Sequence, residues 1–445
     1  MKRTLFVLAT LGTFTNITHA ENSTPAAPKD DGSFTYRATD NSYLTLYGIL
    51  DAGIATQNRS ASISDSLPNQ IYPYQSTPSA TVNHSVTGAI SGGLSDSRVG
   101  LKGGLDLYDG AKAIFNVETG FSLTSGQLND AAKTIAANPK GTTNSVNADS
   151  SINGQLFNRQ AWFGIADKTL GTFTIGKQNN PMKDVVDSYN PVKSDTFSPL
   201  GESGAVGGGG GISENARMQN SVKYSNTIDG FKAVLAYQFG NNSGSTSEGS
   251  GYAINLGYEN DIFGVQAVYN NFTDALKAVQ APTAGDIALQ AFDTDAYMLT
   301  GKYKVVKDLT LSAGWERINL KDPSDIPSAT KLNISSIWGY TVSSVTAGLA
   351  PGVSQEENVY FIGGDYNFMP NLNFALGYYD TKADDKTNTS NTAFSIKSYS
   401  AVLDYHFTKK VEGYLAATTN KFGGDAYAAN NGTITAYGTG LRVKF

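Results

Sequence analysis

Basic side chains alternate with apolar ones in two segments of the sequence. This spacing would place the charges on one strand face, where they could interact with ions and polar solutes. Arg98 and Lys102 occupy even positions between apolar odd ones, and Arg217 and Lys223 occupy odd positions beside apolar even ones. Because successive side chains of a β-strand point to opposite faces, each pair would share one face of a strand. A charge facing lipid at mid-membrane costs roughly 2–4 kcal/mol, so in a membrane these faces must meet water. Fixed charges along a narrow aqueous path can favour one sign of ion and orient polar solutes.

Carboxylates could stand opposite these cations. Glu118 and Asp51 fall on the water-facing parity of their own segments. Four more acidic residues lie in or beside a later polar segment: Asp184, Asp187, Asp195 and Glu202. Two interpretations therefore remain open. The charges either form a selective ring, or the Lys and Arg residues merely solvate an interior and pair with these acids.

Residues for bond-making chemistry are few. A hydrolase needs a nucleophile whose His base is oriented by a third group. The sequence has no Cys and only three His, of which His19 lies in the leader described below, His84 in a long loop and His406 beside a short turn. The last two should lie at opposite ends of the molecule. The glycine run at 207–211 is not followed by the Lys-Ser or Lys-Thr of a phosphate-binding loop. We therefore predict no catalytic site, no metal site and no cofactor.

The N-terminus has the three parts of an export signal. Lys2 and Arg3 precede an apolar run from Leu5 to Phe14, and Thr18-His19-Ala20 is a suitable cleavage site. This pattern predicts a signal peptide at 1–20. Residues 21–41 are polar without any period, which is typical of a mobile tail. No later apolar run approaches the roughly 20 residues that a spanning helix needs.

Net charge excludes one class of partner. The formal charge is −6, and removal of Lys2 and Arg3 from the 33 basic residues leaves 31 against 39 acidic ones. Binding to the phosphates of nucleic acid requires a basic surface, so nucleic acid is not an expected partner.

From residue 42 to 445, segments of about ten residues with period-two alternation recur, separated by short turns and longer polar loops. This pattern predicts an all-β fold, a transmembrane antiparallel β-barrel of about 16 strands. The expected strands are 43–57, 96–107, 111–122, 156–166, 171–178, 218–226, 230–240, 251–259, 262–271, 294–304, 308–318, 357–367, 371–381, 396–407, 410–420 and 433–445. The short connections should face the periplasm and the long ones the outside. A soluble β-sandwich would need two or more such domains to hold so many strands.

The last expected strand ends on Phe445 and alternates throughout. Phe445, Val443 and Leu441 share one face, and Lys444 and Arg442 share the other. A terminal aromatic on such a strand looks like an outer-membrane assembly signal. We expect this strand to pair with the one beginning near Tyr43, with Arg442 and Lys444 at the periplasmic mouth, away from any constriction.

Six runs in order resemble the general diffusion porins of Gram-negative bacteria, of the beta-proteobacterial type. They are Leu46–Gly53, Ser97–Gly103, Ile114–Phe121, Phe157–Trp162, Gly171–Gln178 and Arg217–Tyr224. The resemblance implies a homotrimer of sixteen-stranded barrels with an inward-folded third extracellular loop, here about 179–217. It also implies that Arg98, Arg159 and Arg217 face acidic groups of that loop across a constriction.

The resemblance further implies an outer-membrane porin that lets small hydrophilic solutes and ions diffuse passively. The three basic wall positions, opposed by the acidic loop, predict a weak anion preference. The porin's expected partners are outer-membrane lipid, lipopolysaccharide and the barrel-assembly machinery. Two alternatives remain: a substrate-selective channel, and a barrel that serves mainly adhesion or surface display.

Overall fold

The computed structural model describes residues 34–39, 42–58, 85–108, 110–124, 126, 128, 156–200, 216–240, 245–280, 286–323, 336–337, 340–347, 354–385, 394–423 and 433–445. The predicted signal peptide, His84, Glu202 and the glycine run at 207–211 lie outside these residues.

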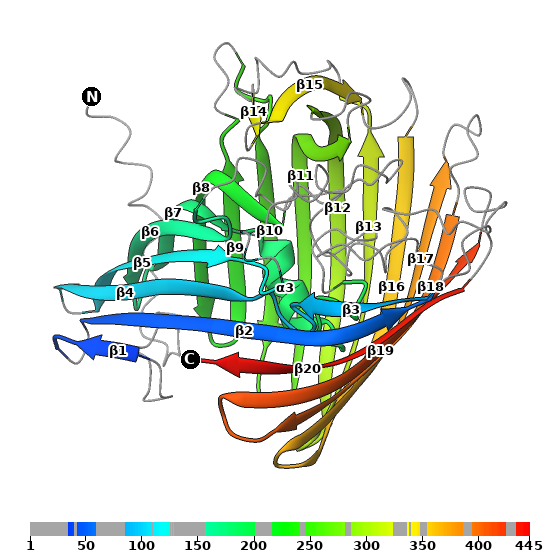
Figure 1. Ribbon diagram of the computed structural model, residues 1–445. Coiled ribbons are helices and arrows are strands. Elements are labelled where there is room, and N and C mark those ends of the chain that lie inside the picture. The colour runs from blue at the N-terminus through cyan, green and yellow to red at the C-terminus, as the bar shows by residue number, and fades with distance from the viewer. Residues whose placement is uncertain are drawn as a thin grey trace.

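Sixteen long strands form one closed antiparallel barrel, as the alternation predicts (Figure 1). They are β2 (Tyr43–Gln57), β4 (Arg98–Tyr108), β5 (Ala111–Gly120), β6 (Gln160–Asp167), β7 (Gly171–Asn179), β8 (Arg217–Ile228), β9 (Phe231–Gln238), β10 (Gly251–Glu259), β11 (Phe263–Gln280), β12 (Asp286–Val306), β13 (Leu309–Lys321), β16 (Ser354–Met369), β17 (Leu372–Asp385), β18 (Phe394–His406), β19 (Val411–Gly423) and β20 (Thr433–Lys444).

The first and last long strands close the barrel. β20 pairs with β2 from Ile49↔Lys444 to Gln57↔Ala436, and Figure 1 shows the blue β2 beside the red β20. Phe445 extends this pairing, because its N–H donates to the Gly48 carbonyl at 3.0 Å and its carbonyl accepts from the Gly48 N–H at 2.8 Å. The expected partnership of the final strand with the strand near Tyr43 is confirmed.

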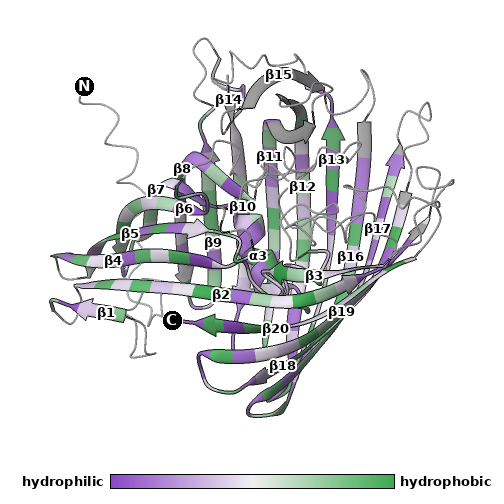
Figure 2. Cartoon of the chain, viewed as in Figure 1, coloured by the Kyte–Doolittle hydropathy of each residue, from purple (hydrophilic) through white to green (hydrophobic). Residues whose placement is uncertain are grey.

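The barrel is apolar outside and polar inside. On β19, Leu415 is 58% exposed, whereas the alternate residues Thr418 and Asn420 are buried. Figure 2 shows hydrophobic and hydrophilic residues alternating along the strands. A soluble protein would bury the apolar face instead, so this arrangement is that of a barrel whose outer surface meets lipid.

Aromatic side chains gather near the short turns, as expected of a membrane-interface belt. The Tyr366 and Phe368 rings pack edge to face with centroids 4.5 Å apart, and the Tyr405 and Phe407 rings do so at 5.1 Å. No helix among the described residues is long and apolar enough to cross a membrane.

Four shorter strands lie outside the sequence prediction: β1 (Phe34–Arg37), β3 (Val86–Ser91), β14 (Ser336–Ile337) and β15 (Tyr340–Ala347). β1 departs from the expected unstructured tail at 21–41, because it pairs with Tyr43–Leu46 and the Phe34 ring packs on the Phe445 ring at 6.4 Å. Four residues are too few to show a period. β11 and β12 also run beyond their expected ends, to Gln280 and from Asp286, with an irregularity between Phe272 and Ala275.

Candidate functional site

A bend at 92–97 interrupts the wall beside β2. The first part of β2, from Tyr43 to Ile49, pairs with β4, and its last part, from Ala52 to Gln57, pairs with β3. The chain between β3 and β4 therefore leaves the sheet at this bend. Gly92 has φ +84°, a left-handed conformation that glycine adopts without strain. The bend brings Asp96 to the start of β4, two residues before Arg98.

Asp51 holds the bend in place. Its carboxylate accepts hydrogen bonds from the backbone N–H groups of Gly93 at 3.2 Å, Leu94 at 2.8 Å and Ser95 at 2.9 Å. The Tyr414 hydroxyl also donates to it at 2.8 Å. Asp51 is fully buried, so it is a structural anchor rather than a charge on an open water-facing wall.

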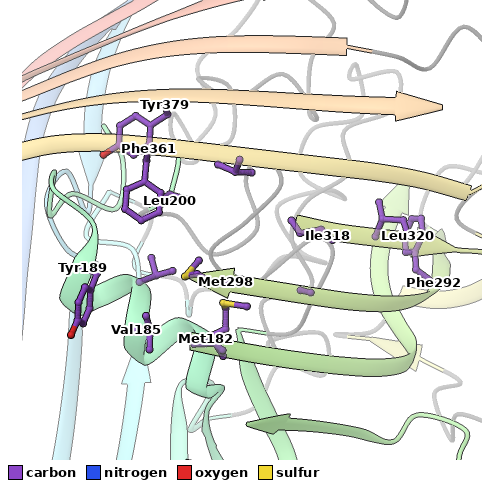
Figure 3. Packing of buried hydrophobic residues seen from close by; sticks show 14 residues of the cluster. Met182, Val185, Tyr189, Leu200, Phe292, Met298, Ile318, Leu320, Phe361 and Tyr379 are labelled. Carbon is purple, nitrogen blue, oxygen red and sulfur yellow. The ribbon is translucent and has the colours of Figure 1, made fainter. Parts of the chain in front are cut away.

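The connection from β7 to β8 begins with the helix α3 (Pro181–Tyr189). The Asn180 side chain caps this helix by accepting a hydrogen bond from the Met182 N–H at 3.0 Å. The apolar side of α3, including Met182, Val185 and Tyr189, packs in one cluster with buried side chains of β11, β12, β13, β16 and β17 (Figure 3).

The segment at 190–197 continues from α3 to the opposite arc of the barrel. The Tyr379 hydroxyl of β17 donates to Asn190 Oδ1 at 2.7 Å. Ser194 Oγ donates to the Gly93 carbonyl at 2.8 Å, and Thr196 Oγ1 donates to the Gly92 carbonyl at 2.7 Å. This part of the predicted third loop thus contacts inward-facing residues of β17 and the bend at 92–97.

Two expected wall arginines meet a carboxylate pair beside the bend. Arg159 Nη1 lies 2.6 Å from Asp96 Oδ2, and Arg159 Nε lies 2.7 Å from Glu118 Oε1. Arg98 Nε lies 3.5 Å from the other oxygen of Glu118. Glu118 is buried, and its two arginines come from the neighbouring β4 and from the residue just before β6. The structure therefore brings Arg98, Arg159 and Glu118 together on the barrel wall, whereas the resemblance implied acidic partners on the third loop for the two arginines.

Asp195 joins this group through the bend. Its carboxylate accepts a hydrogen bond from the Asp96 N–H at 2.7 Å, and its own N–H donates to the Leu94 carbonyl at 3.1 Å. Burial and then the charge of the Asp96 carboxylate raise the pKa of Asp195 to about 6, against a smaller opposing effect of Lys183. We call the six residues Arg98, Arg159, Arg217, Asp96, Glu118 and Asp195 the charged cluster.

Arg217 is only 2% exposed and begins β8. Its charge attracts Glu118, which links it to Arg98 and Arg159. The burial of Arg217 differs from the expectation of an open wall position. Its strand is joined to the start of the α3 connection by a backbone hydrogen bond from the Asn180 N–H to the Ala216 carbonyl at 2.9 Å.

The other expected residues form separate pairs. Lys102 lies over the Tyr47 ring, 5.1 Å from its centroid, and the Tyr47 hydroxyl donates to Glu118 at 3.0 Å. Lys223 Nζ lies 3.2 Å from Asp184 Oδ2. Asp187 pairs with Lys183 on α3. The interpretation that lysines pair with loop acids thus holds for Lys223.

Sequence reasoning missed Asp96, Tyr414 and Tyr379. Asp96 shares the even parity of Arg98, which is a signal that could have identified it. The two tyrosines carry no such signal, because their partners Asp51 and Asn190 are 363 and 189 residues away.

Arg442 is closer to the charged cluster than expected. Its Nη1 donates to Ser95 Oγ at 2.7 Å, next to Asp96, so it does not stand apart at the mouth. It also pairs with Glu412, as does Lys444 Nζ at 2.6 Å.

Three groups that could ligate a metal meet beside these cations. Asp404, His406 and Glu412 each offer an atom within 4.8 Å of the others. Arg442 and Lys444 already neutralise Glu412, so this donor set suits an ion-pair network and does not fit a divalent cation.

A cavity of about 310 Å³ lies where α3 meets the short turns. Its lining includes Lys193, Lys302 and Lys304, together with Glu259 and Asp365. Lys302 Nζ lies 2.7 Å from Glu259 and 4.6 Å from the centre of the Tyr189 ring.

A closed antiparallel barrel with an apolar outside and a polar, charged inside defines the class of outer-membrane β-barrels. Comparison with known proteins makes this assignment specific. Residues 5–425 match the Gram-negative porin family, and the chain belongs to that family. An outer membrane porin protein of Bordetella pertussis, strain Tohama I, is 28% identical over 254 residues, which are 54% of this chain and 49% of that protein. The chain thus spans about half the length of this curated relative. The protein is located in the outer membrane.

Solved structures share the fold at low identity. The anion-selective porin from Comamonas acidovorans has a TM-score of 0.60 and 18% identity, covering 91% of this chain and 100% of that one. OmpT of Vibrio cholerae has a TM-score of 0.58 and 14% identity, with coverage of 92% and 99%. Salmonella typhi OmpF in complex with daunomycin has a TM-score of 0.52 and 16% identity, with coverage of 91% and 98%.

Proposed function

We propose that the protein is a water-filled channel through which small hydrophilic solutes and ions diffuse passively across the outer membrane. The observation that carries this proposal is the meeting of the charged cluster with the segment at 190–197 inside the barrel. A wall of fixed charges on one side of a path and a loop on the other is suited to filtering hydrated solutes by size and charge. Membership of the porin family supports a channel over an enzyme.

We further propose that α3 and the segment at 190–197 narrow the channel as the third, inward-folded loop. Their contacts support this role, since they join β17 to the bend beside β2. The open cross-section is then bounded by the charged cluster on one side of the loop.

A weak anion preference fits the charges. The charged cluster contains three guanidinium groups and three carboxylates, and the raised pKa of Asp195 makes its negative charge the easiest to lose. Lys102 adds a further positive charge on the same wall. The Comamonas relative, described as anion-selective, supports the same sign.

The assembled form that we propose is a homotrimer in outer-membrane lipid and lipopolysaccharide. A Vibrio cholerae OmpT structure described as a trimer form supports this state. We also propose that Phe445 is the signal for the barrel-assembly machinery, because it pairs with Gly48 where β20 closes the barrel on β2. Its ring packs on Phe34 of β1 at the same seam.

Liposome swelling with neutral sugars of increasing size tests the diffusion channel. We expect fast swelling with monosaccharides and a smooth fall in rate with sugar size, because sieving depends on dimensions rather than on identity. Liposomes that carry folded protein and do not swell with any sugar would contradict the proposal. They would favour the adhesion or display alternative.

A substrate-selective channel is the second candidate, and the cavity of about 310 Å³ is the observation that favours it. Lysines and carboxylates line this cavity, which suits a small solute that carries charges of both signs. Current block that saturates with one such solute, and not with a sugar of equal size, would support this candidate over general diffusion.

A further inference from the structure

Two lysines face each other on the outer surface of the barrel. Lys397 of β18 is paired in register with Lys421 of β19. Both side chains are exposed, whereas Ser398 and Asn420 beside them are buried. The lysines therefore point away from the lumen. They lie near the strand ends that lead to the connections 386–393 and 424–432, far from the short turn at 407–410.

Within the described part of the chain, neither lysine of this pair forms an ion pair. Side chains directly opposite on antiparallel strands have Cβ atoms about 4.5–5.5 Å apart, and like charges there repel and destabilise the pair. Asp380 of β17 is the register partner of Lys397 on its other side, but its carboxylate lies 3.4 Å from Lys382 Nζ. Asp380 thus faces Lys397 across the strands, but its ion pair is with Lys382.

The level of the pair in the membrane points to the source of a counterion. Tyr399, two residues along β18 from Lys397, packs against Tyr378 with ring centroids 5.1 Å apart, as expected of an interfacial aromatic belt. Leu376 and Leu415 are exposed further toward the short turns, in the apolar band. The lysine pair therefore lies just beyond the belt, at the level of the lipid headgroups.

We propose that Lys397 and Lys421 form a docking site for the phosphorylated headgroup of an outer-leaflet lipid. A phosphate carries up to two negative charges and several acceptor oxygens, so one group can bridge two ammonium ions at this separation. The proposal rests on the proposed orientation, in which the long connections face outward. It adds a specific lipid contact to the proposed channel and does not depend on conduction.

Native mass spectrometry of the purified protein in non-ionic detergent, titrated with lipid A, tests this site. The double variant Lys397→Gln/Lys421→Gln should bind bisphosphorylated lipid A roughly thirtyfold more weakly than the wild type, since two lysines are lost from the headgroup contact. Dephosphorylated lipid A should bind wild type and double variant equally. Raising the salt concentration should narrow the difference between the two proteins.

The charge-matched control is Lys409→Gln/Lys410→Gln at the short turn, which should bind like the wild type. Heat-resistant migration in gels and unchanged bilayer conductance of the double variant establish that its fold and channel are intact, so loss of conduction is scored separately against the channel proposal. Equal lipid A binding by double variant and wild type would overturn the site. So would full competition by free inorganic phosphate, or a change in oligomeric state with unchanged lipid binding, which would assign the surface to a second copy of the chain.

Discussion

At the residue scale, Arg98 and Arg159 both form ion pairs with Glu118 but have different roles. Arg159 bridges Asp96 and Glu118 at 2.6 and 2.7 Å and is largely buried, whereas Arg98 is more exposed and stands 3.5 Å from Glu118. Arg159 therefore holds the charged cluster together, and Arg98 supplies charge to the path. Arg217 is buried, which makes it the poorest of the three for separating selectivity from folding.

Replacing Arg98 by Gln should reduce the preference for chloride over potassium by roughly two- to fivefold, because a unit charge near a permeating ion in water contributes about 1 kcal/mol or less. Reversal potentials in a salt gradient measure this. Barrel stability in a thermal melt should stay close to that of the wild type. Replacing Arg159 by Gln should alter the reversal potential and also lower the melting temperature, because it leaves two carboxylates without their main partner. A melting temperature of the Arg159 variant equal to that of the Arg98 variant would refute this division of duties.

Asp195 should make the ion preference depend on pH. Its pKa is raised from 3.8 to about 6, so the negative charge is present above about pH 6 and is lost as the pH falls through that value. The reversal potential should therefore shift toward anions between pH 7.5 and pH 5. The Asp195→Asn variant should show the low-pH value throughout, whereas Asp184→Asn, which removes the partner of Lys223 instead, should keep the shift. An unchanged pH response in Asp195→Asn would remove this residue from the explanation.

At the element scale, the bend at 92–97 and the segment at 190–197 position each other. Asp51 fixes the bend through three backbone N–H groups, and the hydroxyls of Ser194 and Thr196 bind two carbonyls of the bend. The period of β2 and β4 could be predicted because one face meets lipid and the other water. The bend could not, since its shape depends on partners about 40 and 100 residues away.

The double variant Ser194→Ala/Thr196→Val should loosen this junction, since each lost hydrogen bond contributes roughly 0.5–1.5 kcal/mol. Open-channel current noise and brief substates in planar bilayers should increase, while average selectivity should change little. Ser188→Ala, which removes a hydrogen bond inside α3 to the Asp184 carbonyl, serves as the control and should show the current noise of the wild type. Identical noise in all three proteins would mean that the segment at 190–197 does not bound the conducting path.

At the scale of the whole molecule, the barrel is the part that the sequence predicts best. All sixteen long strands lie where alternation of lipid-facing and water-facing residues indicates, and β20 closes on β2 as expected. The short strands β1 and β3 were not predicted, because they hold too few residues to display a period. The contact between Arg442 and Ser95 could not be predicted, because it joins residues 347 positions apart across the closing seam. The sequence thus predicts which side chains of each strand face the interior, but it does not predict the long-range contacts that shape the interior.

The most direct test of the central claim is the current carried by the purified, folded protein in planar lipid bilayers. A water-filled homotrimer predicts stable open conductance that appears in steps of three equal levels and rises in proportion to bulk salt conductivity. Insertion of folded protein without any current, or with current only when a particular solute is present, would contradict a general diffusion channel.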